Sequence, residues 1–210
     1  MNTVYGYQYG AGFGDFWIFA NNLAYLSEEC SEVLFNPTPK MTQFSRSQVP
    51  CYTKLIFDIL NQLDYKQSGK IIPVTDTPTQ YHFRYRNIYC PTKIKFKKVF
   101  TKNIVYQEDA RCVKPTQGQL DIFFETLKKY KDFNFIRLGL PRTIEENINI
   151  ASRAKAFIGF QSGMTHLCLS VGVPVYLTDL PDIFFPEKYG INQCTTIQEM
   201  IETALFDKIL

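Results

Sequence analysis

The segment from Phe157 to Leu177 restricts the fold of this chain more than any other stretch. It reads as an apolar strand over residues 157–160, a turn at Ser162 and Gly163, a short helix over 165–171, a Gly-Val-Pro break and a second buried strand. Free N–H groups at the start of the helix point back at the turn. Because such a helix end binds phosphate or ribose oxygens, the segment predicts a ligand site.

Strand and helix signals alternate along the rest of the chain as well. In the first half, strands are expected at residues 3–9, 33–35 and 71–74, with a glycine-rich turn over 10–15, a helix to about Glu29 and a helical pattern over 41–63 that Pro50 breaks. In the second half, strands are expected at 103–107, 133–138 and 173–177, with helices from about Gln117 and Ile197. This alternation predicts an α/β fold with parallel sheets, helices on both faces and ligands at the carboxyl ends of the strands.

A change in composition marks the expected boundary between two halves. Residues 79–98 are rich in Tyr, Arg and Lys and lack a clear period, so the connection is expected near Lys98. The alternative is a single decorated sheet.

Three helix starts also carry capping-box spacing, in which a hydroxyl caps a free N–H and a later side chain reaches back: Thr116-x-x-Gln119, Thr143-x-x-Glu146 and Thr196-x-x-Glu199.

Composition excludes several classes of protein. The 210 residues are 45% hydrophobic, which suffices for one sizeable core or two small ones and argues against disorder. No pair among the six cysteines has the spacing of a zinc knuckle or redox motif. The net charge of +3 is too small to indicate nucleic-acid binding by itself. The chain shows neither a signal peptide nor a membrane span, so a soluble, cytoplasmic protein without integral membrane contact is expected.

The glycine-rich turn at residues 10–15 carries the first candidate for chemistry. Its third glycine falls one residue early for a dinucleotide fingerprint, and the second strand ends at Asn36 where that fingerprint needs an acid for the ribose. Both departures disfavour a dinucleotide-dependent oxidoreductase. Asp15 ends the turn at a helix N-terminus, where a negative charge is favoured, so it could act as a general base or serve only as a helix cap.

The segment 157–177 resembles the signature of the ADP-heptose:lipopolysaccharide heptosyltransferases. In that family an Asp-Ser/Thr-Gly-x-x-His-Leu-Ala run precedes a Gly-x-Pro and a buried strand. The matching residues here are Ser162, Gly163, His166, Leu167, Gly172, Val173 and Pro174, whereas Gln161 replaces the family's acid. The resemblance implies a compact GT-B glycosyltransferase, with two small Rossmann-like halves whose parallel sheets face each other across a cleft. Residues 1–98 would form the acceptor-side half and residues 99–210 the nucleotide-sugar-binding half.

The resemblance extends to two further motifs. The family's Gly-x-Gly-Asp run is matched by Gly12, Phe13, Gly14 and Asp15, and its Asp is thought to be the base on the acceptor hydroxyl. The family's Lys-x-Trp-Pro loop holds the donor diphosphate. Here Arg111-Cys-Val-Lys114-Pro supplies the lysine without the tryptophan, and a solvated loop is the alternative.

The remaining candidates surround the expected donor. Ser162, Gly163, Met164 and Thr165 would contact the nucleotide, mostly through backbone N–H groups, while His166 would bind phosphate or serve a structural role. The family's acid bonds ribose or sugar hydroxyls, and Gln161 can still accept and donate there without a charge. Arg142 would lie at the donor rim or on the surface.

These observations predict a metal-independent, inverting transfer of a sugar from a nucleotide sugar to an acceptor hydroxyl, with no cofactor besides that co-substrate. The chain lacks the Asp-x-Asp pair of metal-dependent glycosyltransferases. The acceptor would be a glycan such as lipopolysaccharide, or a hydroxymethylated DNA base bound by the basic residues of 79–102, which could equally form a solvated strand face. A noncatalytic nucleotide-sugar-binding protein is the alternative, and an oxidoreductase a more distant one.

Overall fold

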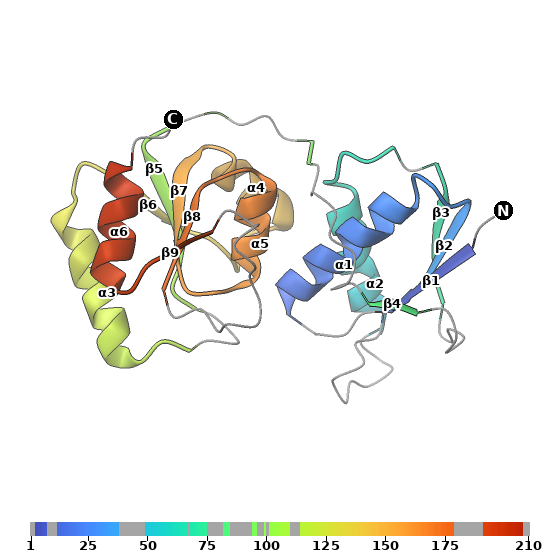
Figure 1. The fold of residues 1–210 in the computed structure, drawn as a ribbon, viewed down its shortest axis with the longest axis horizontal. Coiled ribbons are helices and arrows are strands. Elements are labelled where there is room, and N and C mark those ends of the chain that lie inside the picture. Colours follow the sequence, from blue (N-terminus) through green and yellow to red (C-terminus); the bar gives the residue numbers. More distant parts are fainter. Residues whose placement is uncertain are drawn as a thin grey trace. The chain divides into compact units, whose positions relative to one another are not determined.

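A computed structural model describes residues 3–7, 12–37, 49–66, 68–74, 82–84, 94–95, 99, 101–109, 114–178 and 191–207. The chain divides into two compact units, Met1–Lys95 and Phe96–Leu210 (Figure 1). Each unit contains a sheet of parallel strands, so the expected α/β class is confirmed. The roles expected for the halves 1–98 and 99–210 stay predictions. No helix in the described ranges is long and apolar enough to span a membrane.

The first unit is built on a four-stranded sheet. Its strands are β1 (Thr3–Tyr7), β2 (Glu32–Asn36), β3 (Lys70–Pro73) and β4 (His82–Arg84), in the order β3-β2-β1-β4 with every neighbouring pair parallel. The strand order reverses at β1, because β2 and β3 lie on one side of it and β4 on the other. Helix α1 (Phe13–Leu26) follows β1, and α2 (Val49–Leu60) follows β2.

Aromatic side chains fill the core of the first unit. Helices α1 and α2 contact each other, and the ring of Phe16 stacks on Tyr52 with centroids 5.1 Å apart. Phe19 meets Phe35 of β2 edge to face, and both side chains are fully buried. Buried aromatic pairs stabilise a fold by more than the apolar area that they bury, so these contacts help to hold the small sheet and its helices together.

One expectation about the first unit was wrong in detail, and another is tested only in part. Phe13, Gly14 and Asp15 belong to α1 and not to a turn before it, while Gly10 and Ala11 lie outside the described residues. Of the helical pattern expected over 41–63, the structure describes α2, in which Pro50 is the second residue, while residues 41–48 lie outside the described residues, so the expected break at Pro50 stays a prediction. A proline is tolerated in the first turn, where its missing N–H would have no partner within the helix.

The second unit is built on a five-stranded sheet. Its strands are β5 (Asn103–Gln107), β6 (Asn134–Arg137), β7 (Ala154–Gly159), β8 (Val175–Leu177) and β9 (Ile191–Gln193), in the parallel order β6-β5-β7-β8-β9. Its helices are α3 (Gln117–Lys129), α4 (Ile144–Ala151), α5 (Gly163–Ser170) and α6 (Ile197–Phe206). The sequence predicted these helix positions, but neither β9 nor β4 of the first sheet.

Helices cover both faces of the second sheet. Helices α3 and α6 contact each other on one face, and α4 and α5 contact each other on the other (Figure 1). The core under α3 and α6 includes Ile104 of β5 and Ile158 of β7, together with Phe160 just beyond β7. Since side chains alternate along a strand, Gln107 and Gly159 are on the face of α4 and α5.

Two of the three predicted capping boxes are confirmed. The Thr116 hydroxyl accepts from the N–H of Gln119, whose side chain accepts from the N–H of Thr116, and Thr143 and Glu146 repeat this exchange. The third predicted capping box, at Thr196, was wrong in one of its two hydrogen bonds. Thr196 caps the N–H of Glu199, but the Glu199 carboxylate accepts from the N–H and hydroxyl of Thr195, one residue earlier.

Candidate functional site

The strand order of the second sheet reverses between β5 and β7. From β5 the chain continues to β6 on one side and then crosses to β7 on the other. In open α/β sheets, ligands bind outside the carboxyl ends of the strands at such a reversal. The residues at this point are Gln107, the last residue of β5, and Gly159, the last residue of β7, which are register partners.

Gly159 allows the two strand ends to come close. Its φ is +153°, and a Cβ on it would lie 2.3 Å from the carbonyl oxygen of Gln107. Only glycine fits such an approach. The same Gln107 carbonyl accepts a hydrogen bond from the N–H of Phe160 at 3.4 Å. The chain leaving β7 therefore stays beside the end of β5 until it enters α5.

Helix α5 begins directly at this edge. Ser162 is its N-cap in extended conformation, and Gly163 is its first helical residue, so the expected turn at 162–163 is already the helix start. The Thr165 hydroxyl accepts from the N–H of Ser162 at 3.1 Å, and the Ser162 carbonyl accepts from the N–H of Thr165 at 3.2 Å. The N–H groups of Gly163 and Met164, in the first helical turn, have no acceptor within a helix.

Four buried side-chain oxygens belong to residues at or just beyond the carboxyl ends of β5 and β7. They are Gln107 Oε1, Glu108 Oε2, Gln161 Oε1 and Ser162 Oγ, and none has a hydrogen-bond partner among the described residues. The Gln161 residue is only 7% exposed. Buried polar atoms in proteins are almost always paired, so a group of unpaired ones at a topological switch point indicates a place for a ligand.

The sequence did not single out Gln107 and Glu108. A usable signal was present, since both are polar residues at the carboxyl end of a buried parallel strand, where ligands of α/β sheets are bound. Their burial, however, depends on the neighbouring strand ends. Gln107 lies against Gly139 beyond β6, where an added Cβ would sit 3.1 Å from Gln107 Nε2.

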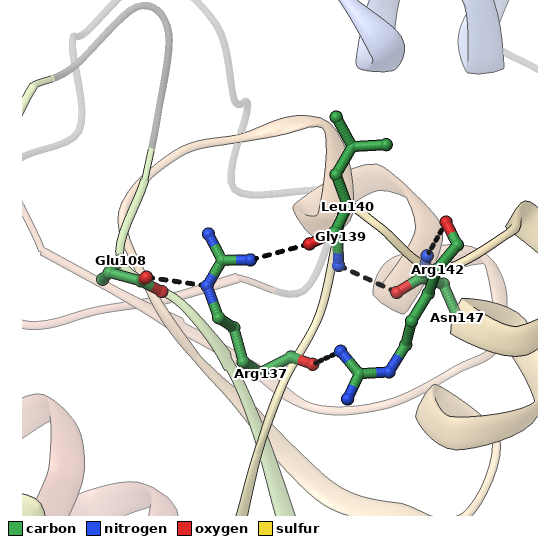
Figure 2. A network of polar contacts seen from close by, with 6 residues as sticks. All are labelled: Glu108, Arg137, Gly139, Leu140, Arg142 and Asn147. Atoms are coloured by element: carbon green, nitrogen blue, oxygen red, sulfur yellow. Dashed lines mark hydrogen bonds and ion pairs between the residues drawn. The ribbon is translucent and has the colours of Figure 1, made fainter.

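An ion pair fixes the orientation of Glu108. Arg137 Nε donates to Glu108 Oε1 at 2.7 Å, and Arg137 Nη1 donates to the carbonyl of Leu140 at 3.0 Å (Figure 2). The hydrogen bond to Glu108 raises the pKa of Arg137. Burial raises the pKa of the neighbouring Tyr106 hydroxyl, and the negative charge of Glu108 adds to that effect. The position of the Glu108 carboxylate is thus set by Arg137 at the end of β6.

Arg142 belongs to the same network. Its Nη1 donates to the carbonyl of Arg137 at 2.8 Å, which directs the guanidinium back toward the end of β6 (Figure 2). The Asn147 side chain holds the loop, accepting from the N–H of Gly139 at 2.8 Å and donating to the carbonyl of Arg142 at 3.3 Å. The predicted donor contact of Arg142 stays a prediction, and the structure shows that the residue supports the loop after β6.

The predicted cation Lys114 is exposed and lies just before Thr116, the N-cap of α3. Its place between β5 and α3 puts it in the loop at the carboxyl end of β5, on the same edge as the start of α5. Arg111 lies outside the described residues.

The side chains of Met164 and Thr165 are buried, with 6% and 0% exposed. A ligand contact at Met164 would therefore use its backbone N–H group, whereas the N–H of Thr165 already donates to the Ser162 carbonyl. His166 is half-buried in the first turn of α5. In the parts of the chain that the structure describes, no group of three His, Cys, Asp or Glu side chains is arranged to hold a metal ion.

Asp15 lies in the first unit, at the start of α1. Its Oδ2 accepts from the N–H of Gly12 at 3.1 Å, and Gly12 is the N-cap. The carboxylate therefore helps to cap the start of the helix. This agrees with the alternative interpretation of Asp15 as a helix cap. Phe13 packs its ring 5.9 Å from that of Trp17, and Gly14 is buried. This motif lies at the carboxyl end of β1, where the order of the first sheet reverses.

No protein-family model and no curated protein sequence matches the chain. Its structure is similar to that of the bacterial iron-containing dodecameric glycosyltransferase TibC from enterotoxigenic E. coli H10407, with a TM-score of 0.51 and 14% identity over 88% of this chain. A second structure, of the dodecameric iron-containing heptosyltransferase TibC in complex with ADP-D-beta-D-heptose, has a TM-score of 0.48 and 14% identity over 87% of this chain. The chain covers 60% of the length of each. The first likeness shows a glycosyltransferase fold.

Proposed function

We propose that the protein is a glycosyltransferase that moves a sugar from a nucleotide-sugar donor to an acceptor hydroxyl. The observation that carries this proposal is the start of α5 at the switch point of the second sheet, beside the buried, unpartnered oxygen of Gln161. A helix N-terminus suits a phosphate, and a buried amide oxygen suits a hydroxyl. The glycosyltransferase fold and the family-like motif from 161 to 174 support the same conclusion.

The donor diphosphate would be bound by the N–H groups of Gly163 and Met164 together with Lys114. When the sugar departs, negative charge develops on the diphosphate, and oriented amides plus a cation stabilise that charge. This set of groups supports a metal-independent transfer, as does the lack of an Asp-x-Asp pair in the sequence.

The acceptor hydroxyl would lose its proton to Asp15 while it attacks the anomeric carbon, which inverts the configuration. The bond from the Gly12 N–H to Asp15 Oδ2 orients the carboxylate. A positioned general base typically contributes a factor of about 100 to 10,000 to the rate. Binding of donor and acceptor in line would supply most of the remaining acceleration.

Release of nucleoside diphosphate tests the proposal. Wild type is assayed with ADP-, GDP-, UDP- and dTDP-sugars, including ADP-heptose, and with lipopolysaccharide or hydroxymethylated DNA as acceptor. Asp15→Asn keeps an oxygen for the Gly12 N–H and should lose activity by at least about 100-fold. Asp58→Asn, which removes a surface carboxylate paired with Lys54 in the same unit, is the matched control. Absence of both turnover and binding with every nucleotide sugar contradicts the proposal.

The second candidate is a noncatalytic nucleotide-sugar-binding protein. Gln161 favours it, because an uncharged residue stands where the related enzymes have an acid. Calorimetric binding of a nucleotide sugar without turnover on any acceptor supports this candidate. An NAD titration addresses the oxidoreductase alternative, and the salt dependence of duplex DNA binding distinguishes a DNA acceptor from a glycan.

A further inference from the structure

We propose that β6 pairs with the β6 strand of a second copy of this chain, in antiparallel direction around a two-fold axis at Phe135. The strand stands first in the order β6-β5-β7-β8-β9, so among the described strands it has a neighbour on one side only. An edge strand can add a further strand through its free backbone groups. The pairing concerns assembly and is independent of the proposed glycosyl transfer.

The backbone groups at the open edge of β6 follow from its pairing with β5. The N–H of Leu138, directly after β6, donates to the carbonyl of Tyr106 at 2.8 Å. The parallel register extends this pattern to the even-numbered residues of β6. The backbone N–H and C=O groups of Phe133, Phe135 and Arg137 therefore point away from β5.

Bonds within the chain occupy the two ends of this edge and leave its middle open. The N–H of Phe133 donates to the carbonyl of Tyr130 at 3.2 Å. The carbonyl of Arg137 accepts from Nη1 of Arg142 at 2.8 Å. In the part of the chain that the structure describes, the Phe133 carbonyl, both groups of Phe135 and the Arg137 N–H have no partner. The open groups thus read acceptor, donor, acceptor, donor along the strand.

This row is complementary to itself when the strand is reversed. With a two-fold axis at Phe135, the Phe135 N–H of each copy donates to the Phe135 carbonyl of the other. The Phe133 carbonyl then accepts from the Arg137 N–H of the other copy, at both ends of the pairing. The two groups that are already bonded, the Phe133 N–H and the Arg137 carbonyl, face each other. Every open group therefore finds a partner in a second copy.

The residues of β6 offer little protection against such pairing. Natural proteins often block an open edge with lysine or proline residues. The strand Asn134–Arg137 contains neither, and the side chain of its one charged residue, Arg137, donates to Glu108 and to the Leu140 carbonyl. Its length of four residues is its main protection. A stable pairing therefore needs contacts beyond the backbone.

An exposed apolar side chain near each end of β6 can supply these contacts. The Phe206 ring is 63% exposed and lies 6.5 Å from that of Phe133, which directly precedes the strand. Leu140 is 82% exposed, and its carbonyl accepts from Nη1 of Arg137, the last residue of the strand, at 3.0 Å. These two are the most exposed large hydrophobic side chains in the described ranges.

Antiparallel pairing brings these two side chains toward each other. The amino end of one β6 lies beside the carboxyl end of the other, so Leu140 of each copy approaches Phe206 of its neighbour. Removal of both side chains from water would stabilise the dimer. Because one chain carries both halves of the contact, a second copy fits this edge better than an unrelated strand.

Sedimentation velocity of the full chain, from about 1 µM to about 500 µM, tests the pairing. A dimer with a Kd on the order of 10 µM is expected, because the contact is smaller than a standard interface. Leu140→Lys and Phe206→Glu should each weaken dimerisation at least about tenfold, since each places a charge in an apolar contact. The double variant should dimerise more tightly than either, because its opposite charges meet across the axis. Gln193→Lys, an exposed change on the other edge strand, β9, should dimerise like wild type.

Amide hydrogen exchange, followed by NMR in the wild-type chain, tests the register without any substitution. The N–H groups of Phe135 and Arg137 should exchange more slowly as the protein concentration rises, since they are bonded only in the dimer. The N–H of Ile136 donates within the sheet, so its exchange should not follow dimerisation.

Each contrary result is distinct. A monomer at every concentration overturns the proposal and leaves the edge to a strand of another protein. Slow exchange of the Phe135 amide in the monomer overturns it as well, because this chain would then cover the edge itself. A dimer that leaves the exchange of Phe135 and Arg137 unchanged forms through another surface. A double variant no tighter than the single variants overturns the antiparallel direction.

Discussion

A Cβ on Gly159 would lie 2.3 Å from the carbonyl oxygen of Gln107, at the point where β7 ends beside β5. The φ of Gly159 is +153°, a conformation that other residues rarely adopt. Gly159→Ala should therefore lower the free energy of unfolding by about 2–4 kcal/mol, because it adds both a collision and backbone strain. Urea unfolding followed by far-ultraviolet circular dichroism measures the change.

Gly118→Ala is the control for this substitution. Gly118 lies in the first turn of α3, and no atom comes within 4 Å of its added Cβ. Alanine should stabilise the helix there by about 0.5 kcal/mol, since it has less backbone freedom to lose than glycine. A Gly159→Ala protein that unfolds within about 0.5 kcal/mol of wild type would contradict the close approach of the two strands.

Arg137→Met should destabilise the second unit by about 1–2 kcal/mol. The change leaves the Glu108 carboxylate without its donor at 2.7 Å, and an unsatisfied polar group in a largely buried place is costly. Urea unfolding of Arg137→Met, and of the double variant with Glu108→Gln, measures the effect. The double variant should recover part of the loss because it removes the charge left unpaired.

Lys128→Met provides the comparison for that ion pair. Lys128 pairs with Glu125 at 2.6 Å, but both side chains are about two-thirds exposed, at 70% and 67%. Exposed pairs contribute little, so this variant should change the free energy of unfolding by less than about 0.5 kcal/mol. Equal losses in Lys128→Met and Arg137→Met would show that the Glu108 pair is no more than a surface contact.

Alternating strands and helices were predictable because most strands contain a run of apolar residues, as in 103–107, which has the expected bounds, and in β7, where 157–160 was expected and Ala154–Gly159 is observed. Strands β4 and β9 were missed because neither His82–Arg84 nor Ile191–Gln193 has the run of apolar residues that marks the equally short β8. In β9, Asn192 and Gln193 are exposed, so the strand forms on the hydrogen bonds of the adjacent β8 without an apolar pattern of its own.

The start of α5 was predictable because glycine and hydroxyl residues mark a helix start in the sequence itself. The burial of the Gln107 and Glu108 oxygens was not, because a polar residue that ends a strand and another that follows it look like the beginning of an exposed loop. What buries them comes from distant positions, including Gly139, Gly159 and Arg137. The burial of a polar side chain depends on tertiary neighbours, and a single sequence does not reveal those.

Acid should destabilise the cap of α4 through Glu146. Hydrogen bonds from Thr143 lower the pKa of the Glu146 carboxyl in the folded protein. A carboxyl whose pKa is lower in the folded than in the unfolded protein stabilises the fold at pH values above its ordinary pKa. That stabilisation is lost as the pH falls through the pKa of the folded protein. The free energy of unfolding of wild type should thus fall more between about pH 5 and pH 3 than that of Glu146→Gln. Glu145→Gln, which removes a charge from the same turn, is the control for the loss of charge alone.

Alkali should destabilise the second unit through its buried thiols. Burial raises the pKa of Cys194 to about 11 and that of Cys168 well above its ordinary value. A thiol whose pKa is higher in the folded than in the unfolded protein stabilises the fold fully at pH values below its ordinary pKa. That stabilisation is lost as the pH rises through the pKa of the folded protein. The free energy of unfolding should therefore decline between about pH 9 and pH 11, and less steeply in Cys194→Ala.

The same thiols should resist alkylation at pH 8, since the thiolate is the reactive form. Mass-spectrometric mapping with iodoacetamide should find the exposed Cys51 modified well before Cys168 and Cys194, which are buried. In 6 M urea, as the control, the three should react at similar rates. Early modification of Cys194 in the folded protein would contradict its burial against α6.

Gln161→Glu should weaken phosphate binding at the start of α5. Gln161 is 7% exposed, directly before the N-cap Ser162, so a new carboxylate there would share the helix end with the donor phosphates. A helix N-terminus favours one anion, but two negative charges in a partly desolvated place repel each other. Calorimetry with inorganic pyrophosphate should show a loss of at least about tenfold for Gln161→Glu and less than about twofold for the uncharged Gln161→Leu. Gln161→Leu should instead lose affinity for nucleotide sugars. Tight pyrophosphate binding by Gln161→Glu would mean that the phosphates bind elsewhere than at the start of α5.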